Sequence, residues 1–446
     1  MILLNHMHNY KEFFKNKKIT VMGLGLLGGV GDIRFLAEAG ADLVVTDLKT
    51  EKELKSSLDV LKKFTNIRYT LGHHDFRDFK NKDLIIKAPS TPLDSLYIKE
   101  ARENKIPITM WAALFSEFAM KAGTKIVGIT GTRGKTTTTI LISEILHKAG
   151  KKVISGGNVQ GTSLLSSLVK LTPNTFVVLE LDSWKLQGFN DTKISPNISV
   201  FTNFLPDHLN YYKGNMKKYF LDKTYIFKNQ KEEDILILSK QSLSFIKKWG
   251  GKIKSKIIIP KERLPKGWQI NLPGLHNEHN VMLAVEVARQ LGIKDSTTKK
   301  TLKNFKSIEG RLQLLIEIKS VKYYNDTTAT TPEATIVALK TLGKKKNIIL
   351  IAGGADKNLN MDELIVQIPK YCKKVVLLSG SGTSRIKNKI KNMVEVNSMK
   401  RAVVVAKTFA KSGDIILLSP AFASFGMFNN EYDRGDQFMK IVKGLK

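Results

Sequence analysis

Residues 125–150, in the first half of the chain, read KIVGITGTRGKTTTTILISEILHKAG. An apolar, β-branched run is followed by a glycine-rich turn and then by a helix-like stretch, which is the order of elements in a phosphate-binding loop. Gly131 and Gly134 allow backbone amides to close on phosphate oxygens, while the start of the helix attracts negative charge. The side chain of Lys135 is predicted to neutralise the phosphates, and the hydroxyl of Thr136 to bind Mg²⁺. The predicted nucleotide loop consists of Gly131, Thr132, Arg133, Gly134, Lys135, Thr136 and Thr137.

The spacing of this loop departs from the strict eight-residue phosphate-loop motif, because Ile129 stands where that motif has glycine. The prediction therefore depends on the strand before the turn and the helix after it. A turn with a purely structural role remains the alternative.

A second glycine motif, GLGLLG at residues 23–28, follows the apolar run ITVM and precedes another helix-like stretch. Asp47 ends the next apolar run, at the distance expected for a dinucleotide-binding fingerprint. Glycines are also needed for close packing at ordinary strand-to-helix turns, so a structural turn is an equal alternative. Without the loop at Gly131, an NAD-dependent oxidoreductase would be the obvious interpretation.

Apolar runs alternate with helix-like stretches along the whole chain, which indicates parallel sheets covered by helices and an α/β fold. The runs begin at residues 19, 41, 83, 125, 175, 198, 234, 347, 373 and 414. A chain of 446 residues is long enough for about three domains at roughly 150 residues each. Breaks near residue 111 and at residues 308–311 predict domains at 1–112, 113–307 and 308–446.

The formal net charge of +32 suggests an anionic partner. Because the lysines occur in short runs spread over the chain, we interpret most of them as solvated surface and expect no nucleic-acid partner. The single cysteine, Cys372, excludes an intrachain disulfide and favours a reducing compartment. The apolar stretch at the N-terminus is too short for a signal sequence, and no run is long enough to span a membrane. These features predict a cytoplasmic protein without membrane insertion.

Acidic and imidazole groups suited to a metal follow the phosphate loop. Glu180 ends the apolar run VVLEL, and Asp207 and His208 lie in the segment FTNFLPDH. Mg²⁺ prefers hard oxygen ligands and keeps several waters, so one carboxylate, one hydroxyl and substrate phosphates are sufficient to bind it. A lone residue of this kind is more often a satisfied core group, but three of them after a phosphate loop favour a functional site.

Eight motifs occur in an order and spacing that resemble the Mur ligases of bacterial cell-wall synthesis. They are TGTRGKTT, GGNVQG, ELDSW, TNFLPDH, GLHNEHN, NDTTAT, AGGADK and LSPAFASF. The match covers nearly the full chain. It implies an α/β fold with a Rossmann-like N-terminal domain, a central ATPase-type domain with the phosphate loop, and a Rossmann-like C-terminal domain.

The resemblance also implies roles for individual residues. The positions that match UDP-sugar-binding residues are Leu26, Leu27, Asp47, Lys49 and Asn158. The positions that match nucleotide contacts outside the loop are Asn277, Asn280, Arg311 and Asp326. The positions that match contacts to an incoming amino acid are Thr330, Lys357 and Ser424.

The implied metal ligands are Thr136, Glu180, His208 and Lys223, and the implied catalytic residues are Lys135, His208 and Lys223. Lys223 matches the family's carbamylated lysine, and a carbamate would turn its amine into an oxygen ligand for a second Mg²⁺. The activity implied is ADP-forming ligation of glutamate, in its D form, to UDP-N-acetylmuramoyl-L-alanine through an acyl phosphate. A monomer is expected, with ATP, glutamate and the UDP-sugar as its partners.

Several positions depart from the family pattern, and they leave alternative activities open. They are Arg133, Lys185, Asn210, Gly310, Thr328 and Glu431. Thr328 and Glu431 are the more consequential departures for specificity, so ligation of L-glutamate or of another amino acid is an alternative. A ligase resembling folylpolyglutamate synthase is a second alternative, which the N-terminal glycine motif opposes. A basic nucleic-acid-associated ATPase is a third alternative, and it is opposed by the joint presence of Lys135, Glu180, His208 and Lys223.

Overall fold

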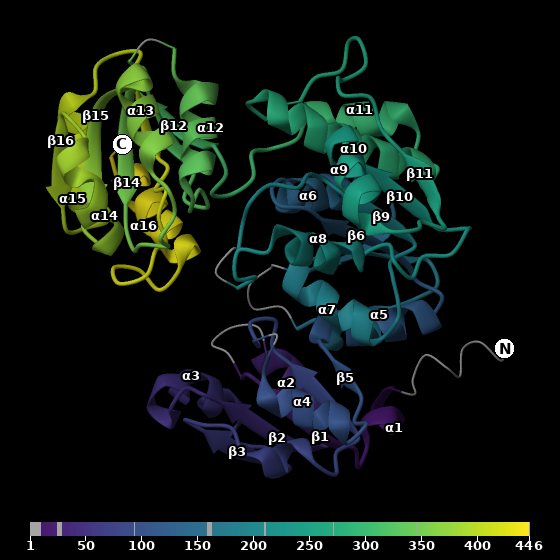
Figure 1. The fold of residues 1–446 in the computed structure, drawn as a ribbon. Helices are drawn as coiled ribbons and strands as arrows, with labels where there is room; N and C mark the ends of the chain where they lie inside the picture. Colours follow the sequence, from purple (N-terminus) through teal and green to yellow (C-terminus); the bar gives the residue numbers. More distant parts are fainter. Residues whose placement is uncertain are drawn as a thin grey trace. The chain divides into compact units, whose positions relative to one another are not determined.

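The structure is a computed structural model, and it divides into two compact units (Figure 1). Unit 1 comprises Met1–Gln269 and His276–Lys303, and unit 2 comprises Ile270–Leu275 and Asn304–Lys446. The residues that the structure describes are 10–24, 29–92, 94–157, 163–208, 211–270, 272–344 and 346–445. The predicted UDP-sugar contacts Leu26, Leu27 and Asn158 lie outside them.

The first sheet of unit 1 has parallel strands in the order β3-β2-β1-β4-β5 within the described residues. The strands are β1 (Lys18–Met22), β2 (Asp42–Asp47), β3 (Ile67–Leu71), β4 (Leu84–Lys87) and β5 (Ile108–Thr109). The helices are α1 (Tyr10–Phe14), α2 (Val30–Glu38), α3 (Glu51–Leu61), the 3₁₀ helix η1 (Phe76–Phe79) and α4 (Leu96–Glu103). Helix α3 begins with a capping box, in which Thr50 and Glu53 satisfy each other's backbone amides.

The second sheet of unit 1 is also parallel, with the order β11-β10-β9-β6-β8-β7 in the part of the chain that is described. Its strands are β6 (Lys125–Thr130), β7 (Lys152–Gly156), β8 (Thr175–Glu180), β9 (Ile198–Phe201), β10 (Ile235–Leu238) and β11 (Lys256–Ile258). Its α-helices are α5 (Trp111–Lys121), α6 (Lys135–Lys148), α7 (Ser183–Asp191), α8 (Met216–Thr224), α9 (Lys240–Phe245), α10 (Leu275–Gln290) and α11 (Asp295–Lys303). The shorter helical turns are η2 (Leu165–Lys170) and η3 (Ile246–Gly250).

Unit 2 holds the third sheet, with the order β12-β13-β17-β14-β15-β16 among its described residues. Its strands are β12 (Gln313–Ile318), β13 (Val321–Asn325), β14 (Ile348–Gly353), β15 (Cys372–Leu378), β16 (Met393–Val396) and β17 (Ile415–Leu418). Its helices are α12 (Pro332–Leu342), α13 (Asp362–Tyr371), α14 (Ser381–Ile386), η4 (Lys387–Lys389), α15 (Met399–Phe409) and α16 (Glu431–Lys443). The edge strand β12 pairs with β13 in the antiparallel sense, which differs from the all-parallel sheets predicted from the sequence.

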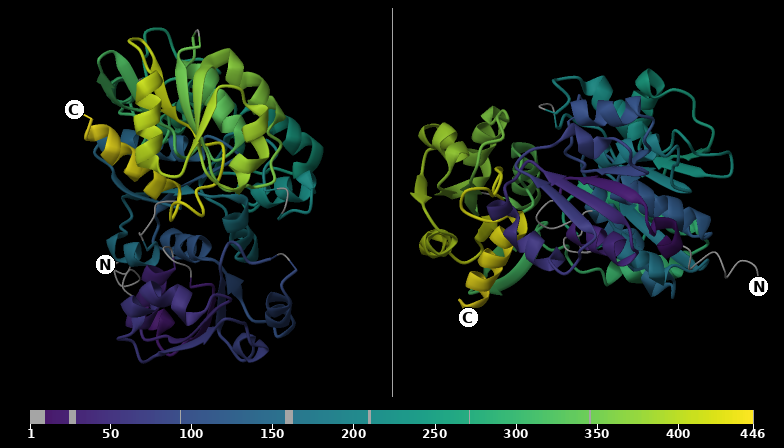
Figure 2. Two further views of the ribbon diagram at one scale, coloured as in Figure 1. Left: turned by 90° about the vertical axis from the view of Figure 1, so that its left-hand side faces the viewer. Right: turned by 90° about the horizontal axis from the view of Figure 1, so that it is seen from below.

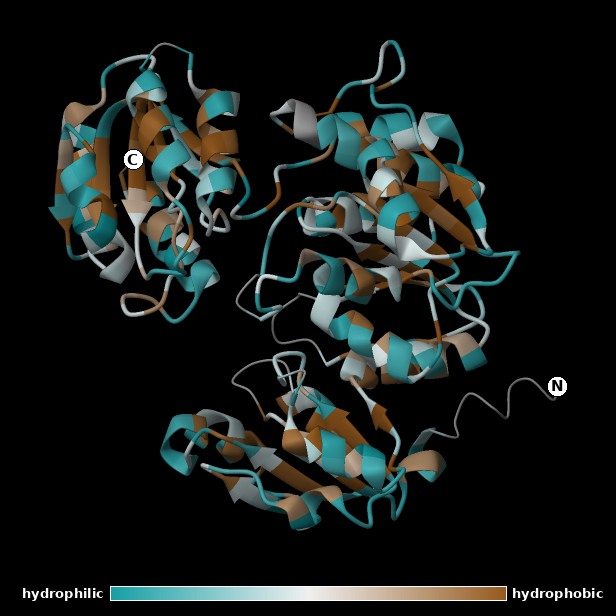
Figure 3. Ribbon diagram, in the orientation of Figure 1, coloured by the Kyte–Doolittle hydropathy of each residue, from teal (hydrophilic) through white to brown (hydrophobic). Residues whose placement is uncertain are grey.

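The strands of each unit are apolar and enclosed by helices, as the brown strands of Figure 3 show. In unit 2, Ile348, Leu350 and Ala352 pack against α12, α13 and α14, whereas Ile349 and Ile351 pack against α15 and α16. The views in Figure 2 show helices on both faces of this sheet. All six residues of β14 are buried, as expected for a strand of a parallel sheet that is covered on both sides.

The predicted α/β class, with three mainly parallel sheets, is therefore confirmed. The ten apolar runs that predicted strands form β1, β2, β4, β6, β8, β9, β10, β14, β15 and β17. The domain limits at 112 and 307 remain predictions. In the described ranges, no helix has the length and apolar character to cross a membrane.

Candidate functional site

The glycine-rich turn between β6 and α6 adopts a backbone that only glycine accommodates. Gly131 has a φ of 138° and Gly134 a φ of 84°. A Cβ atom on Gly131 would lie 1.9 Å from Oγ1 of Thr202, and one on Gly134 would lie 2.2 Å from Oδ1 of Asn280. The two glycines therefore let β9 and α10 approach the turn closely, and the turn stands at the carboxyl end of the sheet, where α/β proteins bind ligands.

The segment after β9 anchors this turn. The Thr132 amide donates to the Asn203 carbonyl over 2.9 Å, and the Arg133 amide donates to Asn203 Oδ1 over 2.9 Å. The hydroxyl of Thr202 donates to the carbonyl of Arg133 over 2.6 Å. A phosphate bound at Thr132 and Arg133 would therefore share or replace these hydrogen bonds.

Lys135 is the first residue of α6, and its Nζ donates to the carbonyl of Thr132 over 3.1 Å. Burial lowers the pKa of this ammonium, and the carboxylates of Glu180 and Asp182 act in the opposite direction. The cation is thus held over the turn by its own loop and by two acids. This is the geometry predicted for a lysine that neutralises phosphate charge.

Lys223, on α8, lies against the same turn although it is 92 positions away in the chain. Its side chain is 1% exposed, and its Nζ donates to the carbonyl of Gly131 over 2.9 Å. The Nζ also lies 4.7 Å from the ring centroid of Tyr219. Burial, together with the positive charge of Lys135, lowers the pKa of Lys223 well below its ordinary value. Both effects favour the neutral amine more than water does for an exposed lysine.

Two acids and an imidazole complete the surroundings of the turn. Glu180 ends β8 and is 4% exposed, and Asp207 forms an ion pair with Arg133 over 2.7 Å. His208 Nε2 lies 3.8 Å from Asp207 Oδ2, and burial lowers the pKa of this imidazole. Within the described residues, no three His, Cys, Asp or Glu side chains form a group that could hold a metal. The assignment of Thr136, Glu180, His208 and Lys223 to a metal stays a prediction.

Asp182 belongs to this site, and the sequence analysis missed it. Its carboxylate caps α7 by accepting from the Lys185 amide over 2.9 Å, and it pairs with Lys185 Nζ over 2.8 Å. Burial alone would raise the pKa of Asp182, but Lys185 and then Lys135 hold it well below its usual value. Its place two residues after a strand that ends in Glu180 was the available signal.

Asn277 and Asn280, on the first turns of α10, lie close to the glycine turn. Both are buried, and Asn280 Nδ2 donates to Asn277 Oδ1 over 3.3 Å. Asn280 faces Gly134, since a Cβ on that glycine would clash with the Asn280 side-chain amide. The structure thus places these two predicted nucleotide contacts beside the turn.

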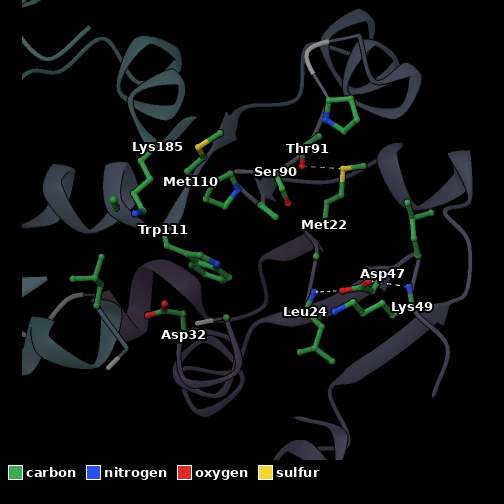
Figure 4. A pocket seen from close by; sticks show the side chains of 18 of the residues that line it. Met22, Leu24, Asp32, Asp47, Lys49, Ser90, Thr91, Met110, Trp111 and Lys185 are labelled. Carbon is green, nitrogen blue, oxygen red and sulfur yellow. Dashed lines mark hydrogen bonds between the residues drawn. The ribbon is translucent and has the colours of Figure 1, made fainter. Parts of the chain in front are cut away.

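A cavity of about 480 Å³ lies in unit 1, between the carboxyl end of the first sheet and the start of α5 and α7 (Figure 4). Asp47 forms part of its wall and accepts hydrogen bonds from the amides of Leu24 and Lys49, each over 2.9 Å. Predicted UDP-sugar contacts Asp47 and Lys49 therefore both line this cavity. Its volume is within the range of small-molecule sites.

Asp32, on α2, is a second residue that the sequence analysis missed. It lines the cavity and is 3% exposed. Its Oδ1 accepts from Ser163 Oγ over 2.6 Å and from the Leu165 amide over 2.8 Å. Because its partners lie more than 130 positions away, no local pattern could have identified it.

Burial raises the pKa of Asp32 to about 6, although its hydrogen bonds act in the opposite direction. The folded-state pKa lies above the unfolded value, so this carboxyl stabilises the fold most at low pH and loses that contribution as the pH rises through about 6. We expect Asp32→Asn, which cannot ionise, to gain stability relative to the wild type between pH 4 and 7. Two pKa units correspond to about 3 kcal/mol at most. Denaturant unfolding of both proteins at several pH values checks this prediction. A difference in unfolding free energy that stays constant from pH 4 to 7 would contradict it.

In unit 2, two of the three residues predicted to contact the amino acid are joined to each other by a hydrogen bond. Lys357 Nζ donates to Thr330 Oγ1 over 3.0 Å. The loop before Lys357 pairs with Ala423 through Ala355, which brings the buried Ser424 to the same end of the sheet. A lysine and two hydroxyls at one loop cluster form a donor set suited to carboxylates.

Asp326, at the end of β13, is buried in the same unit. Its oxygens accept from Ser419 Oγ over 2.8 Å and from the Leu312 amide over 3.0 Å. Burial raises the pKa of Asp326 to about 7, against the influence of Arg311. The predicted nucleotide contacts Arg311 and Asp326 therefore influence each other electrostatically.

The three departures from the family pattern in unit 2 meet at Thr327 and Thr328. Thr328 Oγ1 donates to the Gly310 carbonyl over 2.9 Å, and Thr327 Oγ1 donates to the Glu431 carbonyl over 2.7 Å. Gly310 has a φ of 68°, and a Cβ there would lie 3.0 Å from Thr327. Gly310, Thr328 and Glu431 thus form one local arrangement, with glycine suited to its left-handed backbone.

A glycine turn between a strand and a helix, with lysines and carboxylates around it, is typical of a nucleotide-binding site. Together with three mainly parallel sheets, it indicates a nucleotide-binding α/β protein. Three family models match the chain in succession. They are the Mur ligase MurD-like N-terminal domain at residues 17–110, the Mur ligase middle domain at 129–261, and the Mur ligase glutamate ligase domain at 310–422. The chain belongs to the Mur ligase family.

Curated relatives match over nearly the full chain. A protein of Roseiflexus sp. (strain RS-1) is 36% identical and covers 96% of this chain and 99% of its own length. One of Borreliella afzelii (strain PKo) is 38% identical, covering 97% of this chain and 98% of its own. Both are named UDP-N-acetylmuramoylalanine--D-glutamate ligase.

Solved structures share the fold at low sequence identity. UDP-N-acetylmuramate-alanine ligase MurC of Thermotoga maritima has a TM-score of 0.61 at 18% identity, covering 96% of this chain and 100% of its own. A pseudomurein peptide ligase type C of Methanothermus fervidus has a TM-score of 0.55 at 19% identity, covering 97% of this chain and 100% of its own. These likenesses support the three-sheet α/β architecture.

Proposed function

We propose that the protein is an ADP-forming, ATP-dependent ligase that adds D-glutamate to UDP-N-acetylmuramoyl-L-alanine during peptidoglycan precursor synthesis. Relatives that carry this name match over nearly the full chain, including the N-terminal domain. We place the enzyme in the cytoplasm as a monomer. Its working parts are residues 1–112 for the UDP-sugar, 113–307 for ATP, and 308–446 for the amino acid.

One structural observation carries the proposal: the cavity and the phosphate loop adjoin the same short segment at the end of β8 and the start of α7. Glu180 and Asp182 interact electrostatically with Lys135 at the loop. Lys185, three residues after Asp182, lines the cavity. An acceptor bound in the cavity would therefore extend toward a nucleotide bound at the loop, as phosphoryl transfer between them requires.

The residues at the loop fit a magnesium nucleotide. Thr136, Glu180 and His208 offer the hydroxyl, carboxylate and imidazole that would hold Mg²⁺, which neutralises phosphate charge when it is bound. The buried amine of Lys223 fits the chemistry of a carbamate, because only a neutral amine reacts with carbon dioxide. We propose a carbamylated Lys223 and a second Mg²⁺ on this basis.

The reaction proceeds in two displacements. The carboxylate of the acceptor attacks the γ-phosphorus of ATP, the bond to the β-phosphate oxygen breaks, and ADP leaves as an acyl phosphate forms. Lys135 stabilises the charge that develops on the transferred phosphoryl group. The amine of glutamate then attacks the acyl carbon and loses a proton, and inorganic phosphate leaves with the bonding electron pair. Exclusion of water protects the acyl phosphate from hydrolysis.

Residues of unit 2 are the proposed contacts for the incoming amino acid, and two more are proposed contacts for the nucleotide. Lys357, Thr330 and Ser424 provide a cation and hydroxyls for the two carboxylates of glutamate. Arg311 and Asp326 are the proposed nucleotide contacts in this unit. Thr328 and Glu431 depart from the family pattern in this unit, so the identity of the amino acid needs direct measurement.

We expect ADP release only when ATP, UDP-N-acetylmuramoyl-L-alanine and an amino acid are all present, with D-glutamate preferred over a panel of D- and L-amino acids. Mass spectrometry of the product identifies the residue added. Removal of bicarbonate and carbon dioxide from the buffer is expected to reduce turnover if Lys223 is carbamylated. ADP release that needs no acceptor but responds to DNA would refute the ligase proposal.

A further inference from the structure

Lys185 brings a positive charge into the wall of the cavity from the first turns of α7. Its side chain is 14% exposed, and its Nζ pairs with Asp182 over 2.8 Å. The backbone amide of the same lysine donates to the other oxygen of Asp182 over 2.9 Å. Asp182 therefore fixes both the helix start and the direction of the lysine side chain, which restricts the ammonium to the cavity wall.

Lys185 lies at a different end of the cavity from Asp47 and Lys49, the two residues that the sequence assigned to the UDP-sugar (Figure 4). Figure 4 shows Lys185 beside Met110 and Trp111, on the side of the cavity away from Asp47 and Lys49. Asp182, the partner of Lys185, follows β8, whose last residue Glu180 pairs with Ile129 of β6, the strand that leads into the phosphate loop. Lys185 thus marks the end of the cavity that adjoins the loop.

The proposed acceptor carries anionic groups at two separate places, namely its diphosphate and the carboxylate that reacts. If the uridine end lies by Asp47 and Lys49, the carboxylate end must extend toward the phosphate loop, because that group attacks ATP. A cation at this end therefore meets the carboxylate. Charge-assisted hydrogen bonds between an ammonium and a carboxylate are about twice as strong as neutral ones, and more so where water is partly excluded.

We propose that Lys185 binds the reacting carboxylate of the acceptor and holds it at the phosphate-loop end of the cavity. This inference rests on the proposed function, because it assumes a carboxylate acceptor. Asp182 orients the ammonium before the acceptor binds and shares it afterwards. Lys185 is then a specificity residue that selects acceptors with a free carboxylate over neutral ones.

The test measures the affinity of the full-length chain for two probes by calorimetry. The first is UDP-N-acetylmuramoyl-L-alanine, and the second is its alaninamide, which has the same shape without the carboxylate charge. We expect the wild type to bind the carboxylate probe about 10- to 100-fold more tightly, the range for a charge-assisted hydrogen bond. Lys185→Gln is expected to bind both probes with similar affinity, and Lys185→Arg to retain most of the preference.

The matched control is Lys121→Gln, which removes an exposed lysine of α5 that pairs with Glu117 outside the cavity lining. It is expected to leave both affinities unchanged. A preference for the carboxylate that survives in Lys185→Gln would overturn the proposal. If Lys185→Gln bound both probes more weakly by the same factor, the proposal would also be overturned. Lys185 would then bind the diphosphate or maintain the shape of the cavity.

Turnover separates this proposal from the proposed function. If the wild type forms no product from the acceptor, ATP and D-glutamate, the function itself is wrong. If the wild type is active and Lys185→Gln has an unchanged KM for the acceptor, only the role of Lys185 is wrong. We expect a KM raised about 10-fold or more, with unfolding midpoints of the Lys185 variants near that of the wild type.

Discussion

Replacing Lys135 by alanine is expected to reduce turnover by roughly 10²- to 10³-fold or more, because one preorganised charge donor to a transferring group is typically worth that much. The lysine begins α6, lies over the glycine turn through the carbonyl of Thr132, and faces Glu180 and Asp182. Its loss removes a positive charge beside Glu180, whereas Asp182 keeps its ion pair with Lys185. The phosphates of ATP would then lack this cation at the loop, so ATP binding should also weaken. Single-turnover assays at saturating ATP separate the two effects.

Lys148→Ala is the matched control, because Lys148 ends the same helix and pairs at the surface with Glu144. Its exposed ion pair is worth little, so turnover and stability should both stay near wild type. Lys135→Arg keeps the charge but changes its shape, and it should retain only part of the activity. Unchanged turnover in Lys135→Ala would remove the phosphate-loop assignment and with it the proposed mechanism.

The strands were predictable where burial on both faces makes the sequence continuously apolar. In β14, the run IILIAG is buried at every position, so the sequence signal is strong. The hairpin of β12 and β13 was not predictable in the same way. Lys319 and Ser320, which lie between these strands, both have positive φ, although two-residue turns of this kind usually contain glycine or asparagine. Without a turn signal, the antiparallel edge strand could not be separated from the parallel pattern.

The candidate site was predictable to the extent that its residues are local in the chain. Gly131, Gly134 and Lys135 follow one strand and begin one helix, so the local pattern of strand, glycine turn and helix identified them. Lys223 came only from the family resemblance, since its contact with Gly131 joins residues 92 positions apart. Lys185 was noticed as a departure, but its place in a cavity wall depends on how two sheets of unit 1 pack together.

Arg434 presents the second large expected effect, this time on stability. It lies on α16 with 0% exposure. Its guanidinium donates to Thr327 Oγ1 over 3.1 Å, to the Thr327 carbonyl over 2.9 Å and to the Phe422 carbonyl over 3.2 Å. Burial lowers its pKa to about 10, so it stays charged at neutral pH. One side chain thus joins the loop after β13 to the loop that leads to Ser424.

We expect Arg434→Ala to destabilise unit 2 by on the order of 3–5 kcal/mol, because it leaves two buried carbonyl groups without their donor and opens a cavity. Arg434→Lys should recover only part of this, since an ammonium cannot reproduce the fork that reaches both loops. Arg401→Ala, at an exposed position of α15, is the control and should change stability by less than about 0.5 kcal/mol. Denaturant unfolding measures the loss, and hydrogen exchange should localise faster opening to residues 325–330 and 420–424. If Arg434→Ala were as stable as Arg401→Ala, the guanidinium would not be what holds these loops, and the placement of Thr330 and Ser424 would need another cause.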